Sequence, residues 1–291
     1  MGEIILQAYA KINLGLDVLR KREDGYHEVK MIMQRISLAD TLVLRKCPGG
    51  GILLQGDTET DVSGVPMDAS NLVYRAIQML KEEFQLEEGV EAVLTKRIPV
   101  AAGMAGGSAD AAAALKGMNQ LFSLGLSEQE LRDRGVKLGA DIPYCIMGGT
   151  ALSEGIGERL TPLPPLPSCH ILIAKPPVSV STAFVYGNLR VDELLEHPDI
   201  DGMTEAIRQG SLQGVIDRMG NVLETVTIPA YPEIAVIKSI MLEYGAERSL
   251  MSGSGPTVFG IFPDEAKAMQ AEQAIRKAGY AEQTYLVQPL L

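Results

Sequence analysis

The first part of the chain alternates between apolar and polar side chains. The even-numbered positions from Ile4 to Val18 are all apolar, whereas odd-numbered positions such as Lys11 and Asn13 are polar. Successive side chains point to opposite faces of a β-strand, so this alternation predicts a strand with one face on a core. Lys11 and Asn13 then project side by side from the other face, which the pattern alone predicts to be a solvated outer face.

Later stretches predict a mixture of strands and helices. Strands are expected at residues 31–45, 90–98, 170–175, 257–262 and 283–288. Helices are expected after an N-cap at Ser70, after Asp110, from the capping box of Ser127 and Glu130 to about Gly139, from Thr182, and near 201–226, 232–244 and 264–278. The elements do not follow a regular βαβ order, which indicates the α+β class. The proline-rich stretch at 162–167 predicts a boundary between a domain at 1–162 and another at 163–291.

Charge and composition limit the classes of partner. The chain has 291 residues, of which 46% are hydrophobic and 22% charged, as in ordinary globular proteins. Its net charge of −11 argues against a nucleic-acid partner, because non-specific binding to a phosphate backbone needs a basic surface. An acidic protein binds a small anion only at a local site of a few cations and backbone N–H groups. Short glycine-rich segments are therefore the places to expect such a site.

The cysteines and the N-terminus bear on the compartment. Cys47, Cys145 and Cys169 are far apart and odd in number, which predicts free thiols in a reducing compartment. The three histidines are too scattered to predict a metal site by spacing. The N-terminus lacks a signal-peptide pattern, and no apolar run approaches the roughly 20 residues that span a bilayer. We therefore expect a cytoplasmic protein without a membrane partner, and the cysteines and histidines predict no metal site.

A glycine- and alanine-rich segment at 99–110 runs directly into an alanine-rich helix. Gly103, Gly106 and Gly107 would let the backbone approach a ligand closely, and the helix would offer its unpaired N–H groups to phosphate. The segment has neither the Walker A nor the Rossmann spacing, so a phosphate loop and a plain turn both stay open. Ser108 and Asp110 would either cap this helix or hold Mg²⁺ against ATP oxygens.

A second loop, Ser-Gly-Ser-Gly-Pro-Thr at 252–257, precedes an apolar stretch. Such a run is compatible with a tight turn. Two glycine- and serine-rich loops in one acidic chain nevertheless favour one shared anionic ligand.

These motifs together resemble those of the GHMP kinases, the superfamily of galactose, homoserine, mevalonate and phosphomevalonate kinases. The pattern Pro-x-x-x-Gly-x-x-Gly-Gly-Ser at 99–108 is similar to their phosphate loop. Five further motifs follow the same order: Ala-Lys-Ile-Asn at 10–13, Asp-Gly-Tyr-His at 24–27, Gly-Ala-Asp-Ile-Pro at 139–143, Val-Ser-Thr at 180–182 and Gly-Ser-Gly at 253–255. The set resembles the branch that phosphorylates the 2-hydroxyl of a cytidine-diphosphate-linked methylerythritol in non-mevalonate isoprenoid biosynthesis.

The resemblance implies a two-domain GHMP kinase fold, with an N-terminal α+β ATP domain, a ferredoxin-like C-terminal domain and the active site between them. It implies that Asp141 is the general base and that Lys11 is its charged partner. The implied substrate-binding residues are Asn13, Tyr26, His27, Thr182 and Tyr186. ATP, used with Mg²⁺, would be bound by Pro99, Val100, Ala101, Ala102, Gly103, Met104, Ala105, Gly106, Gly107, Ser108 and Ala109, with Asn71 and Lys96 in the adenine region.

The loop departs from the family pattern in one respect. The family's loop is commonly richer in glycine, and an alanine clashes at any position that needs a positive φ. Phosphate contacts at Ala101, Ala102 and Ala105 therefore stay open, whereas those at the glycines do not.

Two alternative functions remain. A sister kinase acting on homoserine or mevalonate would not need a base-binding group such as Tyr26, His27 and Tyr186. A nucleotide-binding sensor without catalysis would not need both Lys11 and Asp141. The expected partners are ATP and the cytidine substrate, bound by a monomer or a weak homodimer.

Overall fold

The computed structural model describes residues 2–57, 64–281 and 283–291, and the chain forms two compact units. The first comprises Met1–Ala10, Leu38–Val100 and Ala105–Met147, and the second comprises Lys11–Ser37, Ala101–Met104 and Gly148–Leu291. Two long strands, β1 (Glu3–Lys21) and β2 (His27–Cys47), contribute residues to both units. The predicted boundary between residues 162 and 163 divides the chain along its sequence, whereas these units interleave. That boundary stays a prediction.

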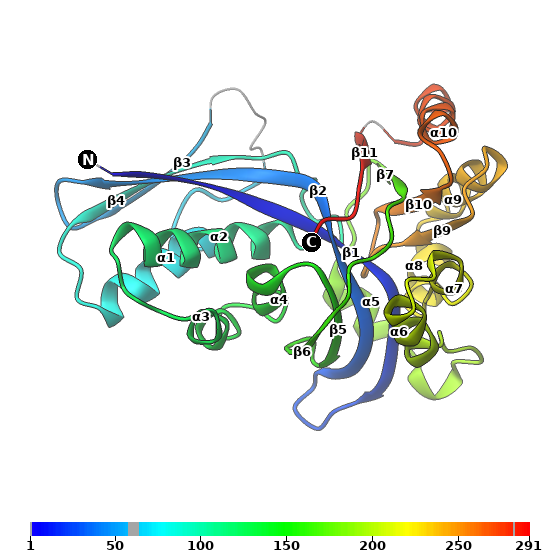
Figure 1. Cartoon of the computed structure of the whole chain (residues 1–291), viewed down its shortest axis with the longest axis horizontal. Coiled ribbons are helices and arrows are strands. Elements are labelled where there is room, and N and C mark those ends of the chain that lie inside the picture. The colour runs from blue at the N-terminus through cyan, green and yellow to red at the C-terminus, as the bar shows by residue number, and fades with distance from the viewer. Residues whose placement is uncertain (1, 58–63, 282) are drawn as a thin grey trace. The chain divides into compact units, whose positions relative to one another are not determined.

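The first unit packs helices against strands. Besides its parts of β1 and β2, it contains β3 (Ile52–Gly56), α1 (Leu72–Glu83), β4 (Gly89–Thr95), α2 (Gly106–Leu121), α3 (Glu128–Gly135) and α4 (Ile142–Met147). β4 pairs antiparallel with β2 and parallel with β3. α1 and α2 lie side by side along these strands (Figure 1). Leu42 and Leu44 of β2 are buried in the core that they share with the helices.

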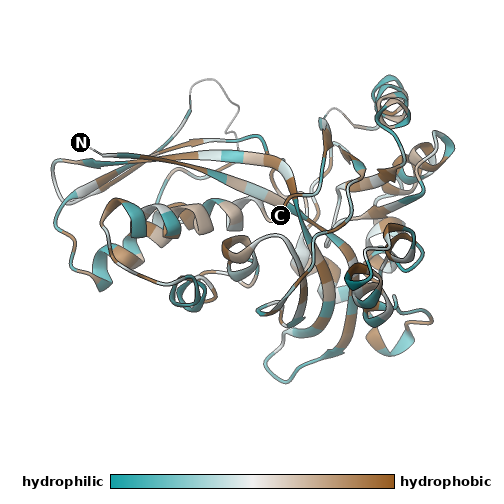
Figure 2. Cartoon of the chain, in the orientation of Figure 1, coloured by the Kyte–Doolittle hydropathy of each residue, from teal (hydrophilic) through white to brown (hydrophobic). Residues whose placement is uncertain are grey.

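The small residues of α2 let it lie close to the strands. The four consecutive alanines at 111–114 are all buried. A Cβ at Gly117 would lie 2.5 Å from Leu44 Cδ1 and 2.7 Å from Leu6 Cδ1, so both leucine side chains would have to move to admit one. In contrast, α3 is largely hydrophilic (Figure 2), and the capping box of Ser127 and Glu130 forms as predicted. The alanine-rich sequence after residue 110 thus encodes a buried helix.

The second unit contains a four-stranded antiparallel sheet. Its remaining elements are β5 (Thr150–Gly155), β6 (Arg159–Leu163), β7 (His170–Lys175), α5 (Thr182–Asn188), a 3₁₀ turn (Val191–Glu193), α6 (Ile200–Arg208), α7 (Leu212–Ile216), β8 (Gly220–Asn221), α8 (Glu224–Ala230), α9 (Glu233–Glu243), β9 (Arg248–Met251), β10 (Val258–Phe262), α10 (Glu265–Lys277) and β11 (Gln283–Val287). The sheet has the order β11-β7-β10-β9, and α9 and α10 pack against it (Figure 1). In chain order β7, α9, β9, β10, α10 and β11 form the βαββαβ motif of ferredoxin-like folds.

Short strands extend the parts of β1 and β2 that belong to the second unit. β5 pairs antiparallel with β2 and with β6, and β8 pairs parallel with β1. Within β6, Pro162 lies opposite Ala151. Proline is tolerated there because β6 has a neighbour on only one side among the described strands.

The structure corrects several predicted boundaries. α1 is capped by Asn71 rather than by Ser70, because the Asn71 side chain accepts from Val73 N, whereas Ser70 donates to Asp68. α3 ends at Gly135 rather than near Gly139. The helical stretch predicted near 201–226 is three separate elements, α6, α7 and the start of α8, with β8 between the last two. Strands β3, β5, β6, β8 and β9 were not predicted.

Among the described helices, none is by itself long and apolar enough to cross a bilayer. α8 and α9 together meet the length and composition required, with a bend of 105° at the break between them.

Candidate active site

The polar face of β1 is buried at Lys11 and Asn13, contrary to the solvated face that its pattern predicted. Lys11 is 5% exposed and Asn13 is 1% exposed. Lys11 Nζ donates to Asn13 Oδ1 at 2.6 Å and to the carbonyl oxygen of Gly103 at 3.2 Å. Lys11 N also donates to the carbonyl oxygen of Met104 at 3.2 Å. The part of the glycine-rich segment at 101–104 therefore covers this face, and the lysine is buried with partners.

Gly103 joins this segment to the second glycine-rich loop. Ser252 Oγ donates to the carbonyl oxygen of Gly103 at 3.1 Å, so this one oxygen accepts from Ser252 and from Lys11. Gly103 has a φ of +70°, and a Cβ on it would lie 2.2 Å from the carbonyl oxygen of Ser252. The two loops thus touch directly. The shared anionic ligand stays a hypothesis, since the direct contact already explains their proximity.

Two alanines of the segment adopt the backbone conformation that the sequence disfavours. Ala101 has a φ of +51° and Ala105 a φ of +57°, both in the left-handed region. Each costs about 1–2 kcal/mol relative to a right-handed conformation. Ala105 is also the N-cap of α2, where an alanine side chain offers no acceptor to the first-turn N–H groups. Ser108 and Asp110 therefore do not cap this helix.

Asp110 belongs instead to a buried ion triad in the first unit. Lys96 Nζ bonds to Asp110 Oδ2 at 2.7 Å and to Asp40 Oδ2. Asp40 Oδ1 accepts from the backbone N–H groups of Arg97 and Ile98, at 2.5 and 2.8 Å. Asp110 Oδ1 is buried and, among the described residues, has no hydrogen-bond partner. The triad therefore ties α2 to the strands and to the start of the glycine-rich segment.

Two carboxylates share the single ammonium of this triad. Burial raises the pKa of Asp110 to about 8, with a further rise from Asp40, and outweighs the lowering effect of Lys96. Burial lowers the pKa of Lys96, but Asp110 and Asp40 together outweigh it, so that this pKa is raised. The Asp110 carboxyl is consequently easier to protonate than an ordinary aspartate, whereas the Lys96 ammonium releases its proton less readily than an ordinary lysine.

The two residues predicted for the adenine region have local partners. Lys96 lies in the triad, and Gly106 lies next to it, since a Cβ on Gly106 would come within 3.4 Å of Lys96 Nζ. The Asn71 side chain accepts from Val73 N at 2.8 Å and donates to the carbonyl oxygen of Pro66 at 2.6 Å. Contact of either residue with adenine stays a prediction.

Asp141 immediately precedes α4 in the first unit. Its carbonyl oxygen accepts from Cys145 N at 3.0 Å, and its side chain is half-buried. The start of α4 is fixed from α3, because Gly135 leaves room for Ile142, whose Cγ2 would lie 2.7 Å from a Cβ at position 135. Lys11 belongs to the second unit, so its pairing with Asp141 stays a prediction.

The structure brings together two of the residues predicted to bind the cytosine. The rings of His27 and Tyr186 have centroids 5.2 Å apart and are tilted by 42°. Burial, helped by the charge of Lys21, lowers the pKa of His27, which favours a neutral ring able to donate and to accept. Tyr26 is 59% exposed. Thr182 Oγ1 hydrogen-bonds Ser254 Oγ at 3.0 Å, which links this predicted substrate-binding threonine to the second loop.

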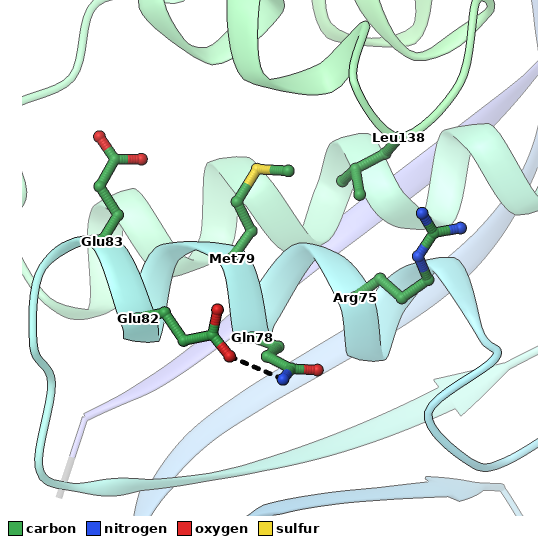
Figure 3. A pocket seen from close by; sticks show the side chains of 6 residues that line it. All are labelled: Arg75, Gln78, Met79, Glu82, Glu83 and Leu138. Atoms are coloured by element: carbon green, nitrogen blue, oxygen red, sulfur yellow. Dashed lines mark hydrogen bonds between the residues drawn. The ribbon is translucent and has the colours of Figure 1, made fainter.

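A hollow in the first unit is lined by none of the predicted site residues. Figure 3 shows side chains of α1 around it, with Leu138 beyond the end of α3. Gln78 and Glu82 bond to each other at 2.7 Å, and Glu83 pairs with Arg134. These contacts are ordinary surface pairs, so the candidate site is the cluster around Lys11, Gly103 and Ser252.

Comparisons with known proteins identify the family. A model described as the GHMP kinases N terminal domain matches residues 71–149, and one described as GHMP kinases C terminal matches residues 203–281. A 4-diphosphocytidyl-2-C-methyl-D-erythritol kinase from Lachnospira eligens is 54% identical over 285 residues, which cover 98% of each chain. A protein of the same name from Enterococcus faecalis is 48% identical over 99% of each chain. This chain belongs to the 4-diphosphocytidyl-2-C-methyl-D-erythritol kinase family.

Solved structures agree with this assignment. The crystal structure of a 4-(cytidine 5'-diphospho)-2C-methyl-D-erythritol kinase superposes with a TM-score of 0.82 and 32% identity, covering 98% of this chain and 99% of the other. A homoserine kinase from Cytophaga hutchinsonii superposes with a TM-score of 0.75 at 20% identity, which shows a shared fold alone. The predicted resemblance, the α+β class and the GHMP kinase fold are confirmed. As a member of a kinase family, the chain is a phosphotransferase with ATP as a substrate.

Some residues around this kinase family's motifs were not predicted. Asp40 is one acidic residue within a predicted strand, and nothing in its neighbourhood marks it as a partner of Lys96. Asn221 bonds to the backbone of the second loop, but it lies within the stretch near 201–226 that was predicted to be helical, with no motif around it. Both act through partners far away in sequence, which no local pattern reveals.

Proposed function

We propose that this chain transfers the γ-phosphoryl group of ATP to the 2-hydroxyl of 4-diphosphocytidyl-2-C-methyl-D-erythritol, giving the 2-phosphate and ADP. The reaction would belong to non-mevalonate isoprenoid biosynthesis. The observation that carries the proposal is the meeting of three family motifs at one carbonyl oxygen, that of Gly103. Lys11 from the first motif and Ser252, which immediately precedes the last, both donate to it.

ATP is proposed to bind along the segment from Pro99 to Ala109. The first turn of α2 supports this proposal, because its N–H groups have no side-chain cap and are available to phosphate oxygens. Gly106 and Gly107 are the first two residues of the helix and keep side chains away from that turn. In an acidic protein, backbone N–H groups of this kind provide a local site for an anion.

The proposed chemistry is general-base catalysis with charge neutralisation. Asp141 would accept the proton of the attacking hydroxyl as its oxygen bonds to the γ-phosphorus and the bond to the ADP oxygen breaks. Lys11 would stabilise the negative charge that the proton leaves behind. Positioning does most of the work in phosphoryl transfer, which suits a lysine held by Asn13 and Gly103.

The cytidine end of the substrate is proposed to lie against His27 and Tyr186, with Tyr26 beside them. A base can stack on the tyrosine rings, while the neutral imidazole of His27 reads its hydrogen-bonding edge. Thr182 and Asn13 would contact the rest of the substrate. The packing of His27 on Tyr186 supports this assignment.

Mg²⁺ is proposed to accompany ATP, as in other phosphoryl-transfer enzymes. Asp110 does not fit as its ligand, because the carboxyl is buried and bonded to Lys96. Among the described residues there is no group of three or more His, Cys, Asp or Glu that could hold a metal. No step of the reaction is therefore assigned to a protein-bound metal.

A coupled assay of ADP release tests the proposal. The protein is incubated with ATP, Mg²⁺ and 4-diphosphocytidyl-2-C-methyl-D-erythritol, with homoserine and mevalonate in parallel reactions. We expect ADP release and a phosphorylated product with the cytidine substrate only. Equal turnover of homoserine or mevalonate would assign the chain to another branch of the superfamily.

Asp141→Asn tests the general base. A positioned base contributes roughly 10²- to 10⁴-fold, so kcat should fall by at least that lower factor while ATP binding measured by calorimetry persists. Asp133→Asn on the exposed side of α3 is the matched control, since its carboxylate bonds only Gln129 among the described residues. A loss below about tenfold in Asp141→Asn would exclude this role.

A further inference from the structure

Asn221 is a buried residue whose side chain binds three backbone groups. It lies on β8, directly opposite Leu16 of β1. Its Nδ2 donates to the carbonyl oxygens of Met251 and Gly253, each at 2.8 Å, and its Oδ1 accepts from Leu223 N at 3.0 Å. An asparagine amide has two N–H donors and one acceptor oxygen, and here both donors and the oxygen form hydrogen bonds.

The two carbonyl groups that Asn221 holds lie on either side of Ser252. Ser252 is fully buried, and its hydroxyl donates to the carbonyl oxygen of Gly103. Gly253 also packs closely against this site, because a Cβ there would lie 3.1 Å from the carbonyl oxygen of Gly103 and 3.5 Å from Asn13 Oδ1. By holding the residues before and after Ser252, Asn221 fixes the direction in which the Ser252 hydroxyl points.

The contacts continue to the predicted catalytic lysine. The Gly103 oxygen that accepts from Ser252 also accepts from Lys11 Nζ, and Lys11 Nζ bonds to Asn13. A displacement of Ser252 would therefore move an acceptor on which the lysine depends. All these residues belong to the second unit.

Other side chains that anchor this loop do so differently. Glu224 Oε1 accepts from Met251 N at 2.8 Å, and Thr227 Oγ1 donates to the carbonyl oxygen of Ser254 at 3.3 Å. Each binds one backbone group of the loop, on one side of Ser252. Asn221 alone among these three binds both sides.

We propose that Asn221 is a positioning residue of this kinase, which holds Ser252 against Gly103 and thereby sets the place of the Lys11 ammonium group. The inference rests on the proposed function, in which Lys11 takes part in phosphoryl transfer. In this proposal Asn221 acts through Ser252 and not through contact with a substrate.

The experiment compares Asn221→Ala, Ser252→Ala and the double variant with a matched control. Misplacement of a catalytic group by about 1 Å costs on the order of a hundredfold, so each single variant should lose roughly ten- to a hundredfold in kcat. Asn221 acts through Ser252, so the double variant should be no more than about twofold worse than the poorer single variant. Multiplicative losses in the double variant would show that Asn221 supports the fold independently and would overturn the proposal.

Asn119→Ala is the matched control. Asn119 binds the backbone of Leu126 in the same manner, donating to its oxygen at 2.9 Å and accepting from its N–H at 3.0 Å. It should lower the melting temperature as Asn221→Ala does but leave kcat within about twofold. Equal kcat losses in Asn119→Ala and Asn221→Ala at equal melting temperatures would contradict a positioning role.

Two further measurements separate this inference from the proposed function. If Asn221→Ala does not fold, Ser252→Ala tests the inference by itself. A wild-type kcat in that variant would show that Ser252 does not position Lys11. If the wild-type protein does not phosphorylate the cytidine substrate, ATP titrations of the same variants replace kcat. In that case ATP affinity should fall at least fivefold in Asn221→Ala and Ser252→Ala and not in Asn119→Ala, and unchanged affinity would refute the inference.

Discussion

Replacing Gly103 by alanine adds one methyl group at the point where the two glycine-rich loops meet. Gly103 has a φ of +70°, which side-chain-bearing residues rarely adopt. The new Cβ would lie 2.2 Å from the carbonyl oxygen of Ser252 and 3.1 Å from that of Gly255. Both contacts are with backbone, which cannot turn aside as a flexible side chain can.

The destabilisation has two parts. A left-handed conformation costs an alanine about 1–2 kcal/mol. Forcing an extra methyl group into packed surroundings costs typically about 1–3 kcal/mol more. The free energy of unfolding should therefore fall by about 2–5 kcal/mol, a large part of the roughly 5–15 kcal/mol that stabilises a typical domain.

Urea denaturation of Gly103→Ala and Gly107→Ala measures this difference. Gly107 lies in the first turn of α2, and a Cβ there would have Leu72 Cδ1 as its nearest neighbour at 3.8 Å. Because alanine favours helix over glycine, Gly107→Ala should keep or raise stability by up to about 1 kcal/mol. Similar stabilities of the two variants, or a loss below about 1 kcal/mol in Gly103→Ala, would show that the loops do not meet as described.

Three other predictions concern the ion triad, the cytidine pocket and a helix cap. Because the pKa of Asp110 is raised in the folded protein, its protonated carboxyl favours folding at low pH, and this contribution is lost as the pH rises towards 8. The stability of Asp110→Asn relative to wild type should therefore increase as the pH rises from 5 to 8, by up to about 4 kcal/mol. A difference in the free energy of unfolding in urea that does not change with pH would contradict the raised pKa. Tyr186→Ala should raise KM for the cytidine substrate roughly tenfold or more and leave KM for ATP unchanged. Equal changes of the two KM values in steady-state kinetics would show that the cytosine binds elsewhere. Ser127→Ala removes the capping box of α3 and should cost about 1 kcal/mol in thermal denaturation without changing kcat; no cost would mean that Glu130 alone supports the cap.

Part of the fold follows from local sequence patterns. Alternation predicted β1, and the Ser127 capping box predicted the start of α3, because both signals lie within one element. The strands that escaped prediction are short, and β8 has only two residues. A strand of that length is defined by its partner rather than by a pattern of its own. Asn71 replaced Ser70 as the cap because adjacent residues compete and the tertiary path of the chain selects one.

Part of the candidate site also follows from motifs. The sequence identified Lys11, the segment at 99–109 and the loop at 252–257 as separate pieces, and each carries a family pattern that local chemistry explains. Their meeting at the carbonyl oxygen of Gly103 was not predictable, because Lys11 and Gly103 are 92 residues apart and Ser252 is a further 149 away.

By itself the sequence determined which residues are chemically competent: a lysine on the polar face of a strand, glycines where backbone must approach closely, and aromatic rings for a base. Only the tertiary structure decided their environment. It buried Lys11 and Asn13, which the pattern assigned to a solvated face of β1, and it placed Asp110 in an ion triad instead of at a helix cap. The physical reason is that burial, and with it the pKa of a group such as Asp110, depends on which distant segments exclude water from it. Periodicity states which side chains share a face, but not what will cover that face.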